Sequence, residues 1–177
     1  MHANKPKPGQ PFPMVVVPQV GGGSLELGTR SSQGNWKLLV VYRGRHCPIC
    51  TRYLNELNAI VPALSKLGVD VAAVSADSET RAVEQLSQVT PAFPVGYGLT
   101  TSQMQELGLY ISGKRHGIDV EGPFAEPGLF VIDHAGNTRI ADISNVPFAR
   151  PDLVSMLKGI TFMRGMKGSF PANGTFA

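Results

Sequence analysis

The feature that most constrains the fold is a junction between a strand-like and a helix-like segment, which holds the chain's only two cysteines. Trp36–Tyr42 is apolar and contains β-branched residues, as expected of a buried strand. From Leu54 to Leu67, apolar residues recur at steps of three and four, which describes one face of a helix. The junction predicts a buried strand, a short turn and a long amphipathic helix, with Cys47-x-x-Cys50 where the helix begins.

The spacing of the two cysteines favours redox chemistry over a structural role. A disulfide between Cys47 and Cys50 would close too small a loop to stabilise the fold much by restricting the unfolded chain. A closed structural zinc site needs four ligands, whereas this motif offers two thiolates with no paired histidines nearby. The remaining standard interpretation is a pair that cycles between dithiol and disulfide, with no metal and no other cofactor.

The start of the helix assigns different roles to the two sulfurs. Pro48 suits the first helical position, because it has no N–H to leave unpaired and its φ angle fits a helix. Cys47 then lies at the helix N-terminus, where unpaired N–H groups and the dipole favour an anion. Cys50 follows one turn deeper on the same face, at about the Cα spacing that a disulfide needs. We therefore expect Cys47 to be the low-pKa attacking thiolate and Cys50 to be the more buried resolving thiol.

Three basic residues stand immediately before the first cysteine. Arg43, Arg45 and His46 are predicted to add positive charge around the Cys47 sulfur. Two interpretations of His46 stay open: it stabilises the thiolate or assists proton transfer, or it is a loop histidine that faces solvent.

Length and composition predict one globular domain over residues 1–177, with a core at about 12–163 and extended tails at 1–11 and 165–177. A net charge of +3 and an aromatic content of 7% disfavour nucleic-acid binding, which needs a basic face with interleaved aromatic residues. No apolar run is long enough to cross a membrane, and the N-terminus lacks the apolar region of a signal peptide. The predicted location is the cytoplasm, where a paired cysteine motif is more often catalytic than structural.

Strand-like and helix-like segments alternate along the chain, which predicts an α/β fold with a central mixed sheet and helices on both faces. Residues 36–42 and 69–75 are expected to be neighbouring parallel strands, and residues 129–143 an antiparallel hairpin. A short N-terminal hairpin is expected around Gly21–Gly23. The predicted strands are 14–18, 25–27, 36–42, 69–75, 129–133 and 138–143, and the predicted helices are 47–68, 78–89, 101–107 and 151–162.

Two segments carry more detailed expectations. In the helix over 78–89, Val83 is placed on the apolar side and Arg81 in solvent. The stretch 111–127 is rich in glycine and charge and is expected to be a long irregular connection.

Two motifs in this order of elements resemble those of a known family. The chain is similar to the thioredoxin-like peroxiredoxins of the alkyl hydroperoxide reductase/thiol-specific antioxidant family over about residues 12–163. Residues 42–50 (Tyr-Arg-Gly-Arg-His-Cys-Pro-Ile-Cys) resemble a subgroup with Arg-Gly-x-x-Cys-Pro-x-Cys, and residues 129–136 look like the family's Phe-x-x-Asp-x-x-Gly hairpin. The resemblance implies a thioredoxin-like fold and a thiol-dependent enzyme without a bound cofactor.

The chain departs from the typical peroxiredoxin site at three positions. Val40 and Gly44 stand where the family has a proline and a threonine that shape the peroxide pocket. Pro127 stands where the family has the arginine that holds the thiolate. Arg43 or Arg45 is a candidate to replace that arginine.

Pro127 also resembles a residue of thioredoxins, the cis-proline that faces the Cys-x-x-Cys motif. This resemblance predicts a cis Glu126–Pro127 bond against the Cys47–Cys50 turn. The backbone around Glu126 would then be free to pair with an extended disulfide-bearing substrate.

Three functions are compatible with these residues. The leading hypothesis is a cytoplasmic enzyme in which Cys47 reduces a hydroperoxide, Cys50 closes a disulfide and an external thiol reductant restores both. The second is a protein disulfide oxidoreductase, with Pro127 shaping the docking site. The third is a non-catalytic metal- or partner-binding module, with cysteines of two chains completing one metal site. A homodimer is among the assemblies compatible with the sequence.

Overall fold

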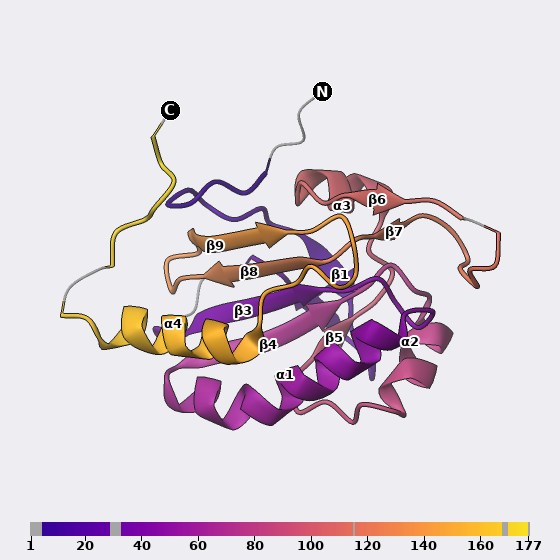
Figure 1. Ribbon diagram of the computed structural model, residues 1–177, viewed down its shortest axis with the longest axis horizontal. Coiled ribbons are helices and arrows are strands. Elements are labelled where there is room, and N and C mark those ends of the chain that lie inside the picture. Colours follow the sequence, from indigo (N-terminus) through magenta and orange to yellow (C-terminus); the bar gives the residue numbers. More distant parts are fainter. Residues whose placement is uncertain (1–4, 29–32, 115, 168–169, 177) are drawn as a thin grey trace.

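The computed structural model describes residues 5–28, 33–114, 116–167 and 170–176, so parts of both predicted tails lie outside the described residues. Figure 1 shows a central twisted sheet with helices packed against it. The strands are β1 (Val16–Pro18), β2 (Ser24–Glu26), β3 (Trp36–Val41), β4 (Val69–Val74), β5 (Val95–Gly96), β6 (Ile111–Ser112), β7 (Phe124–Ala125), β8 (Gly128–Ile132) and β9 (Thr138–Ile143). The helices are α1 (Pro48–Lys66), α2 (Glu79–Leu86), α3 (Thr101–Glu106) and α4 (Leu153–Gly165).

β3 is the middle strand of a five-stranded sheet with the order β5-β4-β3-β8-β9 (Figure 1). It pairs in parallel with β4, with Leu39 opposite Ala72 at the centre, and antiparallel with β8. The prediction of neighbouring parallel strands at 36–42 and 69–75 is therefore confirmed. The predicted hairpins are also present, as β1–β2 near the N-terminus and as β8–β9.

Alternate residues of β3 contribute to the two halves of the core. Leu38 and Val40 pack with α1 and α4, whereas Leu39 and Val41 pack with the β1–β2 hairpin and α3. All four side chains are at most 1% exposed, so the strand is buried on both faces. Burial of side chains of this size contributes about 1.5–3 kcal/mol each. The strand that leads into the cysteine turn is therefore firmly anchored.

The structure corrects two of the sequence-based expectations. In α2, Val83 is 49% exposed and Arg81 only 9%, so these two side chains lie opposite to expectation, whereas Glu84 is exposed and Val89, beyond the end of the helix, is buried as expected. Arg81 is buried because acidic groups surround its guanidinium, as described below. The stretch 111–127 also contains a short antiparallel pair, β6 with β7, which its glycine-rich composition concealed.

Within the described ranges, no helix has both the length and the apolar character needed to cross a membrane.

Candidate active site

The cysteine turn lies at the carboxyl ends of β3 and β4. Because these strands are parallel neighbours, the segments that follow them meet at the same edge of the sheet. Cys47 is the N-cap residue of α1, and Pro48 occupies the start of the helix as expected. Pro48 itself is exposed. The fold thus places the first sulfur at a helix N-terminus that a buried strand supports.

Cys47 is a buried free thiol with an acidic character. Its side chain is 3% exposed, and that of Cys50 is fully buried. Hydrogen bonds from the Cys50 thiol, from the Cys50 backbone N–H and from Arg43, together with the charge of Arg150, lower the pKa of Cys47 to about 6 despite its burial. Cys47 is therefore mostly a thiolate at neutral pH, in line with its position at the helix N-terminus.

Cys50 has the opposite character. Burial, followed by the hydrogen bond to Cys47, raises the pKa of the Cys50 thiol far above its ordinary value. The Cys50 thiol therefore keeps its proton and donates it in a hydrogen bond to the Cys47 thiolate. The two sulfurs form one unit, in which an acidic thiol is held ionised by its protonated neighbour.

Alkylation of the fully reduced protein at mildly acidic pH should label Cys47 before Cys50. The thiolate is the reactive form, so the labelling rate of Cys47 should be half-maximal at about pH 6 and fall about tenfold per pH unit below that. The measurement is peptide mass spectrometry after short pulses of a small alkylating reagent across a pH series. Faster labelling of Cys50 would reverse the assignment of the two sulfurs.

Arg43 is the arginine that reaches the first sulfur, and the β6–β7 pair fixes its position. Its Nε lies 3.0 Å from Glu126 Oε2, and its guanidinium lies over the Phe124 ring, 5.0 Å from the centroid. Glu126 is only 4% exposed and also accepts a hydrogen bond of 2.6 Å from Ser112 Oγ. The buried carboxylate and the ring hold the guanidinium beside Cys47, where it hydrogen-bonds to the sulfur.

Arg45 and His46 do not supply the positive charge that the sequence suggested, whereas a role of His46 in proton transfer stays a prediction. The Arg45 side chain forms ion pairs with Glu84 at 2.6 Å and with Asp119 at 2.9 Å. His46 packs edge-on against the Phe124 ring at 4.5 Å between centroids, and both ring nitrogens are buried although the residue is partly exposed. Burial, followed by the charges of Arg43 and Arg81, lowers the pKa of His46 to about 4. His46 is therefore neutral at neutral pH and adds no positive charge to the site.

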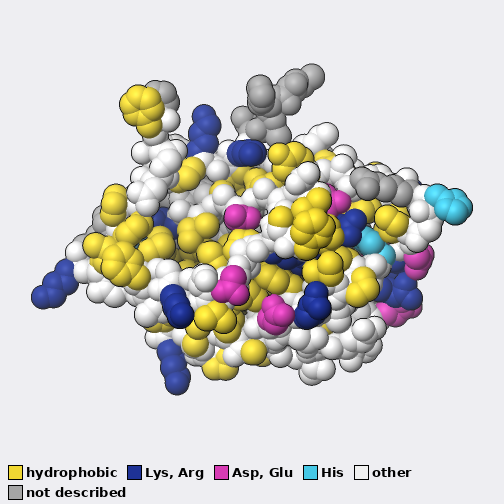
Figure 2. Space-filling model, in the orientation of Figure 1, with side chains coloured by type: hydrophobic (Ala, Val, Ile, Leu, Met, Phe, Trp, Pro, Cys, Tyr) yellow, Lys and Arg dark blue, Asp and Glu magenta, His cyan; other side chains and the backbone are white. Residues whose placement is uncertain are grey.

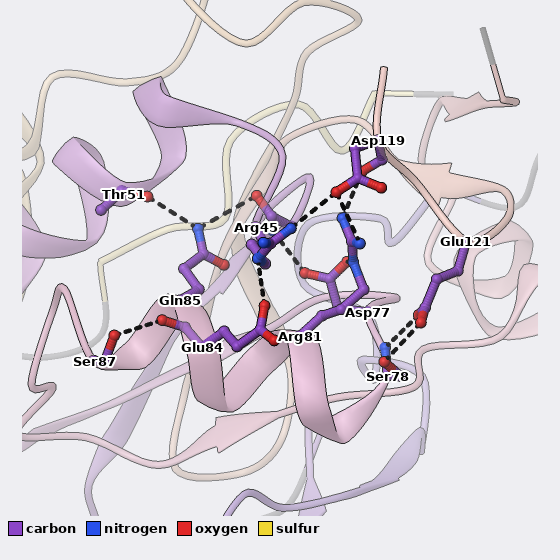
Figure 3. Close-up of polar contacts among 11 residues, drawn as sticks. Arg45, Thr51, Asp77, Ser78, Arg81, Glu84, Gln85, Ser87, Asp119 and Glu121 are labelled. Atoms are coloured by element: carbon purple, nitrogen blue, oxygen red, sulfur yellow. Dashed lines mark hydrogen bonds and ion pairs between the residues drawn. The ribbon is translucent and has the colours of Figure 1, made fainter. Parts of the chain in front are cut away.

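The turn before Cys47 is held by α2 and by the end of β4 (Figure 3). Asp77 Oδ2 accepts a hydrogen bond of 2.7 Å from the Arg45 backbone N–H, and Gln85 Nε2 donates to the Gly44 carbonyl at 3.3 Å. Gln85 also donates to Thr51 Oγ1 at 3.2 Å, which ties the turn to the first turn of α1. Burial raises the pKa of Asp77. These contacts hold the Arg45 N–H and the Gly44 carbonyl, and so fix the turn that precedes Cys47.

Acidic and basic side chains reinforce this support at the surface. Arg81 Nε lies 3.5 Å from Asp77 Oδ1, and its Nη1 lies 3.2 Å from Asp119 Oδ2. Figure 2 shows the mixed charges at the right-hand edge of the molecule, over α2 and the loop before β7. The exposed Asp119 carboxylate, in this loop, pairs with Arg81 on α2 and with Arg45 in the cysteine turn, so it links the loop to both.

Gly44→Ala should destabilise the protein more than Gly22→Ala does. Both glycines have positive φ, +118° and +105°, so an alanine at either position carries backbone strain of about 1–2 kcal/mol. A Cβ at Gly44 would also lie 2.5 Å from an oxygen of Asp77, whereas Gly22 has no atom within 4 Å. The extra loss should be about 1–3 kcal/mol of unfolding free energy in urea titrations. Equal losses would contradict the close packing of Gly44 on Asp77.

The expectation of a cis bond before Pro127 is wrong. No cis peptide bond occurs among the described residues, so the Glu126–Pro127 bond is trans. The Glu126 N–H donates to the Tyr110 carbonyl at 2.8 Å, and the Pro127 carbonyl accepts from the Ser144 N–H at 2.9 Å. These backbone groups are engaged within the protein, because β7 pairs with β6 and β8 with β9.

Four contributors to this site were not identified from the sequence. Arg150 donates to the Cys50 sulfur at 2.9 Å, although 100 positions separate the two residues. Asp77 and Gln85 are brought to the turn by the parallel pairing, and Glu126 by the short β6–β7 pair. The one usable signal was the position of Asp77 directly after a buried strand that was predicted to lie beside β3.

Comparisons with known proteins agree with the fold. The profile of the AhpC/TSA family matches residues 8–141, and no curated protein sequence matches the chain. A cysteine-to-serine mutant of peroxiredoxin 6 from Arenicola marina is similar in structure, with a TM-score of 0.76 and 18% identity over 94% of this chain and 79% of that one. A peroxiredoxin-like protein from Aquifex aeolicus has a TM-score of 0.74 and 17% identity over 91% and 90%. The bacterioferritin comigratory protein of Xanthomonas campestris has a TM-score of 0.69 and 20% identity over 92% and 99%.

Proposed function

This chain belongs to the AhpC/TSA family, and from that premise we propose that it is a thiol peroxidase that reduces hydroperoxides through Cys47. The observation that carries the proposal is the state of the two sulfurs. Cys47 has a pKa lowered to about 6 by the Cys50 thiol, by backbone and Arg43 hydrogen bonds and by Arg150. A thiolate of this kind is the nucleophile that attack on a peroxide oxygen requires.

In the first step, the Cys47 thiolate attacks one oxygen of the hydroperoxide. A sulfur–oxygen bond forms and the oxygen–oxygen bond breaks, so the sulfur is oxidised to a sulfenic acid and the peroxide is reduced to an alcohol or water. The leaving oxygen takes up a proton. Arg43 is positioned to stabilise the negative charge that passes from sulfur to the leaving oxygen, because it already hydrogen-bonds to the sulfur.

In the second step, Cys50 attacks the sulfenic sulfur of Cys47. A disulfide forms and water leaves, made of the sulfenic hydroxyl and the proton from Cys50. The hydrogen bond between the two side chains supports this step, because the sulfurs are already neighbours. An external thiol reductant, in the cytoplasm, then returns both cysteines to the reduced state.

The proposal takes its substrate class from one of the structural neighbours. The bacterioferritin comigratory protein of Xanthomonas campestris is described as having alkyl peroxide reduction activity. We propose hydroperoxides as the substrate class of the present chain.

A protein disulfide oxidoreductase is the weaker alternative for this site. Its docking argument depended on a cis Pro127 and on a free backbone at Glu126, whereas the bond is trans and the Glu126 N–H is bonded to Tyr110. Thiol consumption with and without peroxide, together with insulin reduction, distinguishes the two activities. We expect thiol consumption that depends on added peroxide, and no acceleration of insulin disulfide reduction. Insulin reduction without peroxide-dependent thiol loss would favour the alternative.

The metal- or partner-binding alternative needs a separate measurement. Metal analysis of freshly purified, reduced protein should give well below one ion per chain pair if both cysteines serve the redox cycle. A stoichiometric metal would support a site shared between two chains.

A further inference from the structure

Arg150 reaches the second sulfur of the pair from a distant part of the sequence. It stands in the segment between β9 and α4, and its Nη2 lies 2.9 Å from Cys50 Sγ. The Cys50 thiol is itself hydrogen-bonded to Cys47. The contacts therefore form a chain from the Arg150 guanidinium through Cys50 to Cys47.

Several contacts hold the Arg150 guanidinium in this position. It lies over the Tyr53 ring, 5.1 Å from the centroid, and its Nε donates to the Pro147 carbonyl at 2.7 Å. The Tyr53 hydroxyl donates to the Pro151 carbonyl at 2.9 Å, which ties the same segment to α1. Nη1 of Arg150 is buried and has no hydrogen-bond partner among the described residues. The group is thus fixed in place while part of its donor capacity is unused.

The titratable groups around this contact come from several elements. Tyr42, at the end of β3, and Cys47 lie on the Cys50 side. Tyr53 and Asp142 line, with Arg150, a cavity of about 10 Å³, which is the size of one water molecule. Glu56 on α1 and Asp152 before α4 line a surface hollow with Arg150 on its other side. Arg150 is the group among them that donates directly to the Cys50 sulfur.

Cys50 faces a difficulty that the first cysteine does not. To attack the sulfenic acid it must lose its proton, but burial holds the pKa of its thiol far above the ordinary value. Once Cys47 is oxidised, its negative charge no longer holds the Cys50 proton in place. A cation in contact with the Cys50 sulfur would then favour the thiolate.

We propose that Arg150 is the catalytic cation of the second step, in which it stabilises the Cys50 thiolate as that sulfur attacks the Cys47 sulfenic acid. The Cys50 proton leaves with the sulfenic hydroxyl as water, and the new bond joins the two sulfurs. This assignment rests on the proposed peroxidase function. It divides the work between two arginines, Arg43 at the attacking sulfur and Arg150 at the resolving sulfur.

The test compares Arg150→Met with Arg52→Met in rapid-mixing experiments with peroxide, in which the sulfenic acid and the disulfide are quantified by quenching and mass spectrometry. Arg52 is an exposed cation on α1 that lines the same surface hollow as Arg150, so it controls for loss of nearby charge. We expect Arg150→Met to slow disulfide formation by about 10- to 100-fold, the range for loss of a hydrogen bond to a charged group. Arg52→Met should leave disulfide formation unchanged.

Two further measurements separate a chemical role from a structural one. In the Cys50→Ser background, Arg150→Met should slow the first oxidation by less than it slows disulfide formation when Cys50 is present, because Arg150 acts on Cys47 only through its charge, whereas it donates directly to the Cys50 sulfur. The rate of disulfide formation should reach its plateau at a higher pH in Arg150→Met than in the wild-type protein. In Arg150→Lys, that pH should return toward the wild-type value. Unfolding measurements on each variant show whether the fold is retained.

The assignment is overturned if folded Arg150→Met forms the disulfide at the wild-type rate, or slows both steps equally. Failure of the peroxidase function itself would be visible separately. In that case the wild-type protein would not be oxidised by peroxide, whatever the arginine variants did.

Discussion

Cys47→Ser should reduce the reaction with peroxide to the level of the buffer alone. The serine hydroxyl is not ionised near neutral pH, so the hydrogen bonds from Cys50 and Arg43 would have no thiolate to stabilise. Cys50 cannot take over, because it is fully buried and its pKa is raised. The measurement is peroxide consumption and thiol loss in a single turnover of reduced protein.

The matched control for Cys47→Ser is Cys50→Ser, which makes the same exchange of sulfur for oxygen one helical turn away. Retention of a fast peroxide reaction in Cys47→Ser, with oxidation appearing on Cys50, would assign the attacking role to the other cysteine. Loss of the fold in Cys47→Ser would be detected as a shifted unfolding midpoint and would call for Cys47→Ala in its place.

Cys50→Ser should consume one equivalent of peroxide and then stop. Serine can still donate a hydrogen bond to the Cys47 thiolate, so the first oxidation should proceed within about tenfold of the wild-type rate. The resolving thiol is absent, and the sulfenic acid should therefore accumulate and react with a sulfenic-acid trap or with an added thiol.

The control for this variant is the wild-type protein, which should give no trapped sulfenic acid once the disulfide has formed. Repeated turnover by Cys50→Ser at the wild-type rate, with no trapped adduct, would contradict an intramolecular cycle.

The fold could be predicted to a large extent from local patterns. The buried strand at Trp36–Val41, the helix that begins at Pro48 and the β8–β9 hairpin follow from periodicity, a proline position and turn residues, all within short segments. The burial of Arg81 on α2 could not be predicted from polarity alone. Asp77, just before the helix, and Asp119, on a distant loop, both pair with Arg81 and make burial of that arginine favourable.

The site could be predicted only where it is local. Cys47 and Cys50 lie on one helical turn, so their roles follow from helix geometry. Arg150 reaches the Cys50 sulfur from the segment between β9 and α4, and Glu126, which follows β7, pairs with Arg43. No local pattern marks a side chain that becomes a partner only after the sheet has formed. Pro127 shows the reverse error. A family pattern predicted a cis Glu126–Pro127 bond, whereas the bond between the paired strands β7 and β8 is trans.

The most direct test of the account is rapid mixing of the fully reduced protein with one equivalent of hydroperoxide, followed by thiol titration and peptide mass spectrometry. The account predicts fast loss of both thiols per molecule of peroxide, through a transient sulfenic acid on Cys47 and with a Cys47–Cys50 disulfide as the product. No thiol loss on the time scale of turnover, or a first oxidation that appears on Cys50, would contradict it.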